Sequence, residues 1–267
     1  MNMIYDSGFL TNSRGMSIFF SAFGQKNSKE AWVFCNPFLE EKVFSQRVYY
    51  NLAKTLAGHE RLAFRFDYEG DGDSEGGCES VNLNDWVSDA KDAAAYIKNH
   101  YEINNICFFG LRLGASVAIL AANETECKKL LLWEPIVDGK SYFDDCLRFN
   151  LTTQLATYRK VIENRKVLYE NLKSGKFVNI MGYEVGDHLA TSICDMNLFE
   201  STEKLNCSVD IIAFSRRLRE SLEKILGNNK KVTLNEMTVE KFWQESNIYN
   251  PNQIKLFEFS INLITGK

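Results

Sequence analysis

The sequence lacks the features that mark several common classes of protein. No apolar run approaches the roughly 18 residues that a membrane-spanning helix needs, so we expect no membrane span. Lysines and arginines form no long block and the formal net charge is −4, which argues against nucleic acid as a partner. The N-terminal residues lack the charged head and apolar core of a signal peptide, and we therefore expect a cytoplasmic protein.

Cysteine and histidine also offer little for metal binding or redox chemistry. The seven cysteines are odd in number and scattered, without a C-x-x-C pair, so we expect reduced thiols. We expect no bound metal and no cofactor. The sequence has only three histidines, His59, His100 and His188, which limits where a catalytic base could come from.

Short apolar segments alternate with helical ones over the first half of the chain. Continuous apolar runs predict buried strands, and spaced apolar positions predict helices, one of them capped by Asn82 or Asn84. The predicted strands cover residues 17–23, 31–35, 62–67, 106–109 and 129–133, and a first helix is predicted over 47–56. This alternation predicts an α/β fold with a doubly wound, mostly parallel sheet.

The alternation stops near Val137. From there to residue 202 the pattern is helical and charged, with 151–172 as its longest helical stretch, which predicts a helical cap over the carboxyl edge of the sheet. A strand at 210–214, a weaker strand at 231–238 and a closing helix at 252–265 complete the expected elements. The predicted domains are therefore a core of residues 1–136 and 203–267 and a cap insertion of residues 137–202.

The turn Gly110-Leu111-Arg112-Leu113-Gly114 has the setting of a nucleophile elbow. An apolar strand leads into it and a helical stretch follows, while glycines flank the turn where side chains would collide. The central residue is an arginine, which stays protonated and cannot attack a carbonyl. Ser116 lies one helical turn further on and is expected to point into the helix packing rather than to replace a nucleophile.

Three segments of the chain resemble the α/β-hydrolase superfamily. They are Asn36-Pro37-Phe38-Leu39-Glu40-Glu41, the D-x-x-G-x-G-x-S segment from Asp67 to Ser74, and the turn at 110–115. More narrowly, the chain resembles the serine-aminopeptidase-like proteins called exosortase A system-associated hydrolase, type 2. That likeness continues through 132–140, 147–148, 181–183 and 242–245. The resemblance implies an α/β-hydrolase fold and an esterase or thioesterase type of activity.

The residues of a serine triad are absent from the places where this fold carries them. A hydrolase of the family has Ser, then Asp or Glu, then His in chain order. Arg112 stands at the serine position, and Ser215-Arg216-Arg217 follows the strand that usually precedes the acid. The loop before the last helix, residues 242–247, has no histidine. Glu134 and Glu245 are the possible acids, and a covalent acyl-enzyme is not expected.

Two roles suit Arg112, and the sequence leaves both open. Its guanidinium could pair with Glu134 or Asp67 as a structural bridge between strand ends. It could instead bind a carboxylate, phosphate or sulfate of a ligand, beside the Leu113 N–H at the start of the following helix. A partner has to exist in either case, because an unpaired recessed charge costs several kcal/mol.

Several residues in other segments are expected to lie near this turn. Phe38, Glu134 and Trp243 are predicted to contribute to a ligand-binding pocket together with Arg112 and Leu113. Glu40 and Glu41 are interpreted as the acidic pair of a helix start.

Three functions are consistent with these residues. The first is a non-catalytic α/β-hydrolase-like protein that binds an acyl-bearing or anionic small molecule in a capped pocket. The second is an ester or thioester hydrolase, or an acyl transferase, in which Glu134 or Glu245 holds water and Arg112 polarises the carbonyl. The third, which follows from the narrower resemblance, is a scaffold protein of a polysaccharide or biosynthetic pathway. The sequence does not indicate an oligomeric state.

Overall fold

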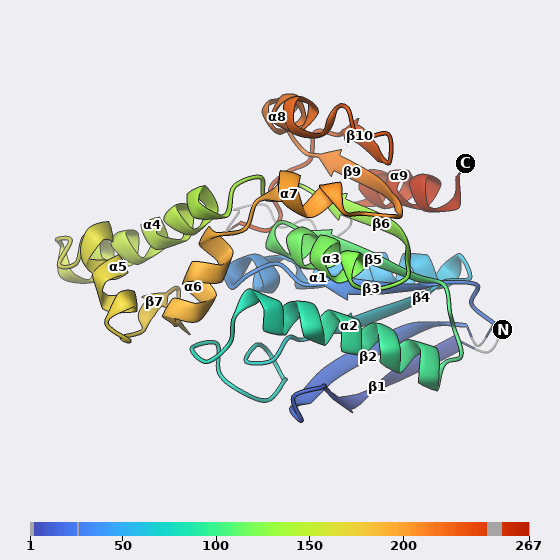
Figure 1. The fold of residues 1–267 in the computed structure, drawn as a ribbon, viewed down its shortest axis with the longest axis horizontal. Helices are drawn as coiled ribbons and strands as arrows, with labels where there is room; N and C mark the ends of the chain where they lie inside the picture. Colours follow the sequence, from blue (N-terminus) through green and yellow to red (C-terminus); the bar gives the residue numbers. More distant parts are fainter. Residues whose placement is uncertain (1–2, 26, 245–252, 267) are drawn as a thin grey trace.

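The computed structural model describes residues 3–25, 27–244 and 253–266. Its central feature is a sheet of eight strands in the order β1-β2-β4-β3-β5-β6-β9-β10 (Figure 1). The pairings of β1 with β2 and of β2 with β4 are antiparallel, and the pairings from β4 to β10 are parallel. The predicted α/β fold with a mostly parallel, doubly wound sheet is therefore confirmed.

The strands of the main sheet are β1 (Met3–Thr11), β2 (Ser17–Gln25), β3 (Ala31–Cys35), β4 (Leu62–Phe66), β5 (Ile106–Leu111), β6 (Cys127–Trp133), β9 (Ser208–Ala213) and β10 (Val232–Glu236). The helices that alternate with them are α1 (Glu40–Gly58), α2 (Leu83–His100), α3 (Leu113–Asn123), α8 (Arg216–Leu226) and α9 (Ile254–Thr265). Between β6 and β9 lie α4 (Gly139–Tyr158), α5 (Arg165–Lys173), β7 (Val178–Ile180), β8 (Tyr183–Val185), α6 (Asp187–Cys194) and α7 (Leu198–Glu203).

Helices cover both faces of the sheet. Side chains of α1 and α9 share one buried apolar cluster, whereas α2 and α3 contribute to the cluster on the other face. Val33 and Phe34 are adjacent in β3 and belong to different clusters, because successive strand residues point to opposite faces. All residues of β3 and β5 are buried, as expected of central parallel strands.

Asn82 is the residue that caps α2. Its side chain accepts the N–H of Asn84 at 2.8 Å and that of Asp85 at 3.2 Å. The Asp85 carboxylate in turn accepts the Asn82 N–H at 2.8 Å, which completes a capping box. The choice between Asn82 and Asn84 that the sequence left open is thus decided by two reciprocal hydrogen bonds.

Two predicted helices have different bounds. The first begins at Glu40 rather than at residue 47. The stretch 151–172 is two helices, because Arg159 adopts a left-handed conformation (φ 59°) that ends α4, and Asn164 caps α5 through the N–H of Val167. The segment also contains the short antiparallel hairpin of β7 and β8.

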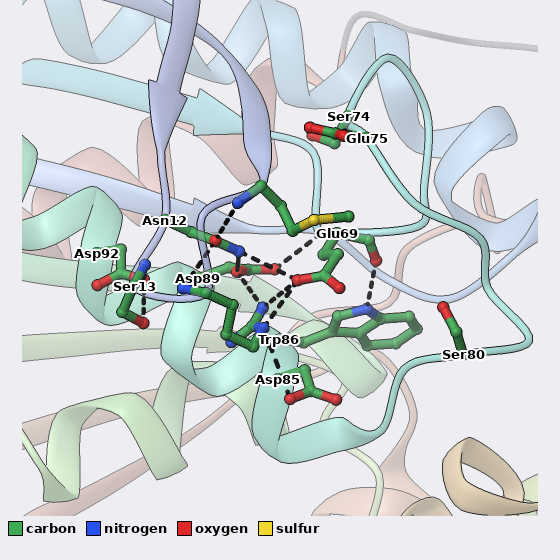
Figure 2. Close-up of polar contacts among 12 residues, drawn as sticks. Asn12, Ser13, Glu69, Ser74, Glu75, Ser80, Asp85, Trp86, Asp89 and Asp92 are labelled. Atoms are coloured by element: carbon green, nitrogen blue, oxygen red, sulfur yellow. Dashed lines mark hydrogen bonds and ion pairs between the residues drawn. The ribbon is translucent and has the colours of Figure 1, made fainter.

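A buried carboxylate fastens the β1–β2 hairpin to the helical layer (Figure 2). Asp89 of α2 is 0% exposed and accepts hydrogen bonds from the Asn12 amide at 2.8 Å and from the Arg14 guanidinium at 2.6 Å. Its second oxygen accepts the Glu69 N–H at 2.8 Å. Burial raises the pKa of Asp89 even though these donors oppose the shift. One side chain therefore joins the hairpin, the loop after β4 and α2.

Candidate functional site

Arg112 forms the turn between β5 and α3. Its backbone has a positive φ of 56° with ψ −122°, a conformation that is strained for a residue other than glycine. The Arg112 N–H donates to the Trp133 carbonyl at 3.1 Å, which continues the ladder with β6. A Cβ on Gly110 would collide with the backbone of Gly114, and one on Gly114 with the carbonyl of Cys35. Glycine is needed at both positions because the backbones of β5, α3 and β3 are in direct contact there.

The guanidinium of Arg112 is held by a carboxylate of α1. Arg112 Nε donates to Glu41 Oε1 at 3.0 Å, and the hydroxyl of Tyr142 donates to Glu41 Oε2 at 2.8 Å. The side chains of Arg112 and Glu41 are only 20% and 15% exposed. The guanidinium also lies over two rings, 5.4 Å from the centroid of Tyr142 and 5.9 Å from that of Trp243. Segments far apart in the sequence therefore meet at this arginine.

Burial and ion pairing together shift the pKa values of Arg112 and Glu41. Burial by itself lowers the pKa of Arg112, but the attraction of Glu41, with a smaller effect of Tyr142, more than compensates and the pKa is raised. For Glu41, burial raises the pKa and outweighs the opposing effects of Arg112 and the Tyr142 hydrogen bond. On acidification Glu41 is consequently the member of the pair that changes charge.

Arg112 thus has a different partner from the two that the sequence suggested. Glu134 Oε2 accepts the Phe214 N–H at 2.6 Å, and Asp67 pairs with Lys42 at 2.7 Å. Burial raises the pKa of Glu134, and Arg112 acts on it as a more distant positive charge. Glu134 is close enough to act on Arg112 as a charge, but the predicted direct pairing of Arg112 with Glu134 or Asp67 is replaced by the contact with Glu41.

Glu41 and Tyr142 are the residues that the sequence analysis missed as site components. Interpreting Glu40 and Glu41 only as a helix-start pair overlooked the position of α1, which begins just after β3, the neighbour of β5 in the sheet. That adjacency was the available signal for Glu41. Tyr142 lies in the first turns of α4 and gave no comparable signal.

The apolar residues predicted to bind a ligand with Arg112 are all buried. Leu113, Phe38 and Trp243 are 1%, 2% and 2% exposed, so their side chains pack inside the protein. Phe38 lies 6.5 Å from Tyr142 between ring centroids. Trp243 Nε1 is buried without a hydrogen-bond partner among the described residues. Glu245, the second possible acid, lies outside the described residues.

The guanidinium of Arg112 has hydrogen-bonding capacity beyond its contact with Glu41. Within residues 3–25, 27–244 and 253–266, Nε is the guanidinium nitrogen for which a hydrogen bond is found, in the contact with Glu41. No hydrogen bond of the two terminal nitrogens is found among the same residues. Arg112 is the residue before α3, whose first backbone N–H groups and helix dipole favour negative charge.

The three histidines lie elsewhere in the structure. His59 follows the end of α1, where its Nδ1 is 2.8 Å from the Thr55 carbonyl oxygen, and His100 ends α2 and stacks on Tyr96. These helix ends lead to the amino ends of β4 and β5, the edge opposite Arg112. His188 is exposed on α6.

Ser116 is 1% exposed in α3, and its Oγ has no hydrogen-bond partner in the part of the chain that the structure describes. Ser215, which follows β9 where the family places an acid, caps α8 through the N–H of Leu218 at 3.3 Å. Both hydroxyls are therefore in structural positions at a helix interior or a helix start.

The strand order and the glycine-flanked turn between β5 and α3 define an α/β-hydrolase. The family described as serine aminopeptidase S33 (Hydrolase_4) matches residues 19–186, and the chain belongs to this family. No curated protein matches the sequence.

Solved structures of similar fold include esterases. The ferulic acid complex of Est1E from Butyrivibrio proteoclasticus has a TM-score of 0.66 at 14% identity, and the match covers 98% of each chain. The esterase Pf2001 of Pyrococcus furiosus has a TM-score of 0.64 at 14% identity, covering 98% of this chain and 89% of that one. DcsB in complex with its substrate analogue has a TM-score of 0.66 at 11% identity, covering 98% and 99%. At these identities the likeness concerns the fold.

Proposed function

We propose that this chain is a non-hydrolytic member of the S33 family that binds an acyl-bearing or anionic small molecule at the carboxyl ends of β5 and β6. The observation that carries the proposal is the contact of Arg112 with Glu41, at 3.0 Å, in the place where the family has its nucleophile. A guanidinium paired in this way can position a ligand but cannot form a covalent acyl-enzyme.

The proposed ligand site uses the side of Arg112 that faces away from Glu41. A carboxylate or phosphate there would accept hydrogen bonds from the terminal guanidinium nitrogens and from the start of α3. Tyr142, in α4, supports the same arginine from the segment between β6 and β9. We therefore retain the division into a core of residues 1–136 and 203–267 and a cap of residues 137–202 as part of the proposal.

Hydrolysis or acyl transfer without a serine is the second candidate. Its support is the buried Glu134, since the raised pKa suits a general base. One of its oxygens is already engaged by the Phe214 N–H, which leaves the other for a water molecule. The narrower likeness to exosortase-associated hydrolases adds a role in a polysaccharide or biosynthetic pathway, and the seven free cysteines favour a cytoplasmic location.

The test combines covalent labelling, turnover and ligand binding on the purified protein. We expect no labelling by a fluorophosphonate probe and no turnover of p-nitrophenyl esters or acyl-thioesters above buffer. Thermal-shift screening of acyl-CoA, phosphosugars and carboxylates should find a stabilising ligand, because saturation at 100 times Kd adds about 2.7 kcal/mol. Arg112→Lys keeps the charge but loses the planar guanidinium, so it should weaken the binding of that ligand.

Arg217→Lys is the matched control, since Arg217 is exposed on α8. Strong fluorophosphonate labelling would contradict the absence of an active nucleophile. Ester turnover that is lost in Glu134→Gln would favour the second candidate. Thermal shifts that are absent for every ligand class, or unchanged in Arg112→Lys, would refute the binding site at Arg112.

A further inference from the structure

The turn between α4 and α5 exposes several apolar side chains at one place. Leu155, Tyr158, Val161 and Ile162 are 50%, 57%, 41% and 57% exposed. We call residues 155–162 the tip. Isolated exposed apolar residues are ordinary, but four within eight residues mark a surface suited to contact something else.

The tip is also basic. It contains Arg159 and Lys160 and no Asp or Glu. Both cations are exposed, and within the described residues neither has an ion-pair partner. Residues 148–177 as a whole carry seven Lys and Arg against two Glu, in a chain whose formal net charge is −4. The segment therefore has a net positive charge in an acidic protein.

A buried amide fixes the shape of the tip. Gln154 Oε1 accepts the N–H groups of Ile162 at 2.7 Å and of Glu163 at 2.8 Å. Its Nε2 donates to the Glu163 carbonyl at 2.9 Å. The left-handed Arg159 then turns the chain out of α4. The apolar side chains are consequently presented outward by a hydrogen-bonded turn, so ordering them on contact costs less entropy.

The tip lies at one end of the molecule. In Figure 1, α4 and α5 extend away from the main sheet, and the turn between them is at their far end. In the described part of the chain no helix is long and apolar enough to cross a bilayer. A membrane contact made through the tip would therefore be at the surface of the bilayer.

We propose that the tip docks on a lipid bilayer surface that carries anionic headgroups. Apolar side chains beside unpaired Lys and Arg suit the boundary between headgroups and acyl chains, where the cations meet phosphate. A projecting end without acidic residues matches a negatively charged, deformable surface. The proposal does not depend on the ligand proposed at Arg112.

The test is flotation of the full chain with lipid vesicles. The vesicles contain phosphatidylcholine alone or with about 30% phosphatidylglycerol. We expect binding to the anionic vesicles, weakened by added salt. Tyr158→Ser/Ile162→Ser removes apolar contact and Arg159→Gln/Lys160→Gln removes charge, and each double variant should bind about tenfold more weakly or worse.

Matched controls change the same residue types elsewhere. Tyr5→Ser/Ile254→Ser removes two exposed apolar side chains, and Arg217→Gln/Lys230→Gln removes two exposed cations. Both controls should bind like the wild type. Equal binding of the tip and control variants, or no binding of the wild type to anionic vesicles, would overturn the proposal. A dimer in light scattering that Tyr158→Ser/Ile162→Ser dissociates, without vesicle binding, would assign the tip to contact between copies and would equally overturn it.

Discussion

The contact between Arg112 and Glu41 makes a quantitative prediction about stability. Glu41→Gln would leave a guanidinium that is only 20% exposed without its counterion. Breaking a fully buried pair costs about 3–5 kcal/mol, and the partial exposure of this one reduces the expected loss to about 2–3 kcal/mol. Arg112→Met should cost less, about 1–2 kcal/mol, because the remaining Glu41 can take up a proton.

A double-mutant cycle measures the interaction itself. The double variant Glu41→Gln/Arg112→Met should lose only about 1–2 kcal/mol, which leaves a coupling energy of about 2–3 kcal/mol. Urea denaturation gives the free energies of unfolding, provided that the m-value is the same for all four proteins.

The surface pair Arg216 and Glu220 provides a control cycle. It has a similar length of 2.9 Å, but its side chains are 83% and 52% exposed. Its coupling energy should be below about 0.5 kcal/mol. A value as small as this for Arg112 and Glu41 would refute the argument that burial makes their pairing structurally important.

Four further predictions concern the same turn and the hairpin. Arg112→Ser should not gain esterase activity against p-nitrophenyl acetate, because His59 and His100 lie at the opposite edge of the sheet and His188 is exposed on α6; a burst of product would contradict this placement. Gly114→Ala should destabilise the protein by more than about 3 kcal/mol in urea, since the added Cβ meets backbone rather than a movable side chain; a loss near zero would show that the turn can relax. Asp89→Ala should cost about 2 kcal/mol, because the Glu69 N–H loses its acceptor while Arg14 and Asn12 keep the Glu69 carboxylate, and hydrogen exchange should rise in the β1–β2 hairpin; uniform exchange across the sheet would argue against a local role of Asp89 in holding the hairpin. Because burial raises the pKa of Glu41, the folded state binds its proton more tightly than the unfolded state, so the free energy of unfolding should fall as pH rises between the ordinary and the raised pKa; Glu41→Gln should flatten this part of the profile, and an unchanged profile would be inconsistent with the shift.

The sequence predicted those elements whose signal is local. The buried strands β3 and β5 are continuous apolar runs, and the turn at Arg112 is recognisable from its flanking glycines. The start of α1 was missed because the pattern before residue 47 mixes charged and apolar residues. The break after Tyr158 was missed because it depends on the Gln154 side chain reaching residues eight and nine positions away.

The partner of Arg112 could not be predicted from local pattern. Glu41 is 71 positions away in sequence, and Tyr142 is 101 positions from Glu41. Their meeting depends on β3 and β5 being neighbours and on the path of α4. Glu134 was a reasonable candidate from its strand end, but the Phe214 N–H competes for its carboxylate. Choosing among acidic residues at one sheet edge requires the side-chain geometry.

The unusual backbone of Arg112 also bears on which substitutions the protein can tolerate. Glycine adopts such dihedral angles freely, whereas any other residue in this conformation lowers the stability of the fold by about 1–3 kcal/mol. A long cationic side chain at this point is therefore a cost that only its contacts can offset. If those contacts were weakened by changes in α1 or α4, glycine would become the more stable choice at position 112. An arginine at position 112 is therefore stable only as long as α1 and α4, which are far from it in the sequence, keep their contacts with it.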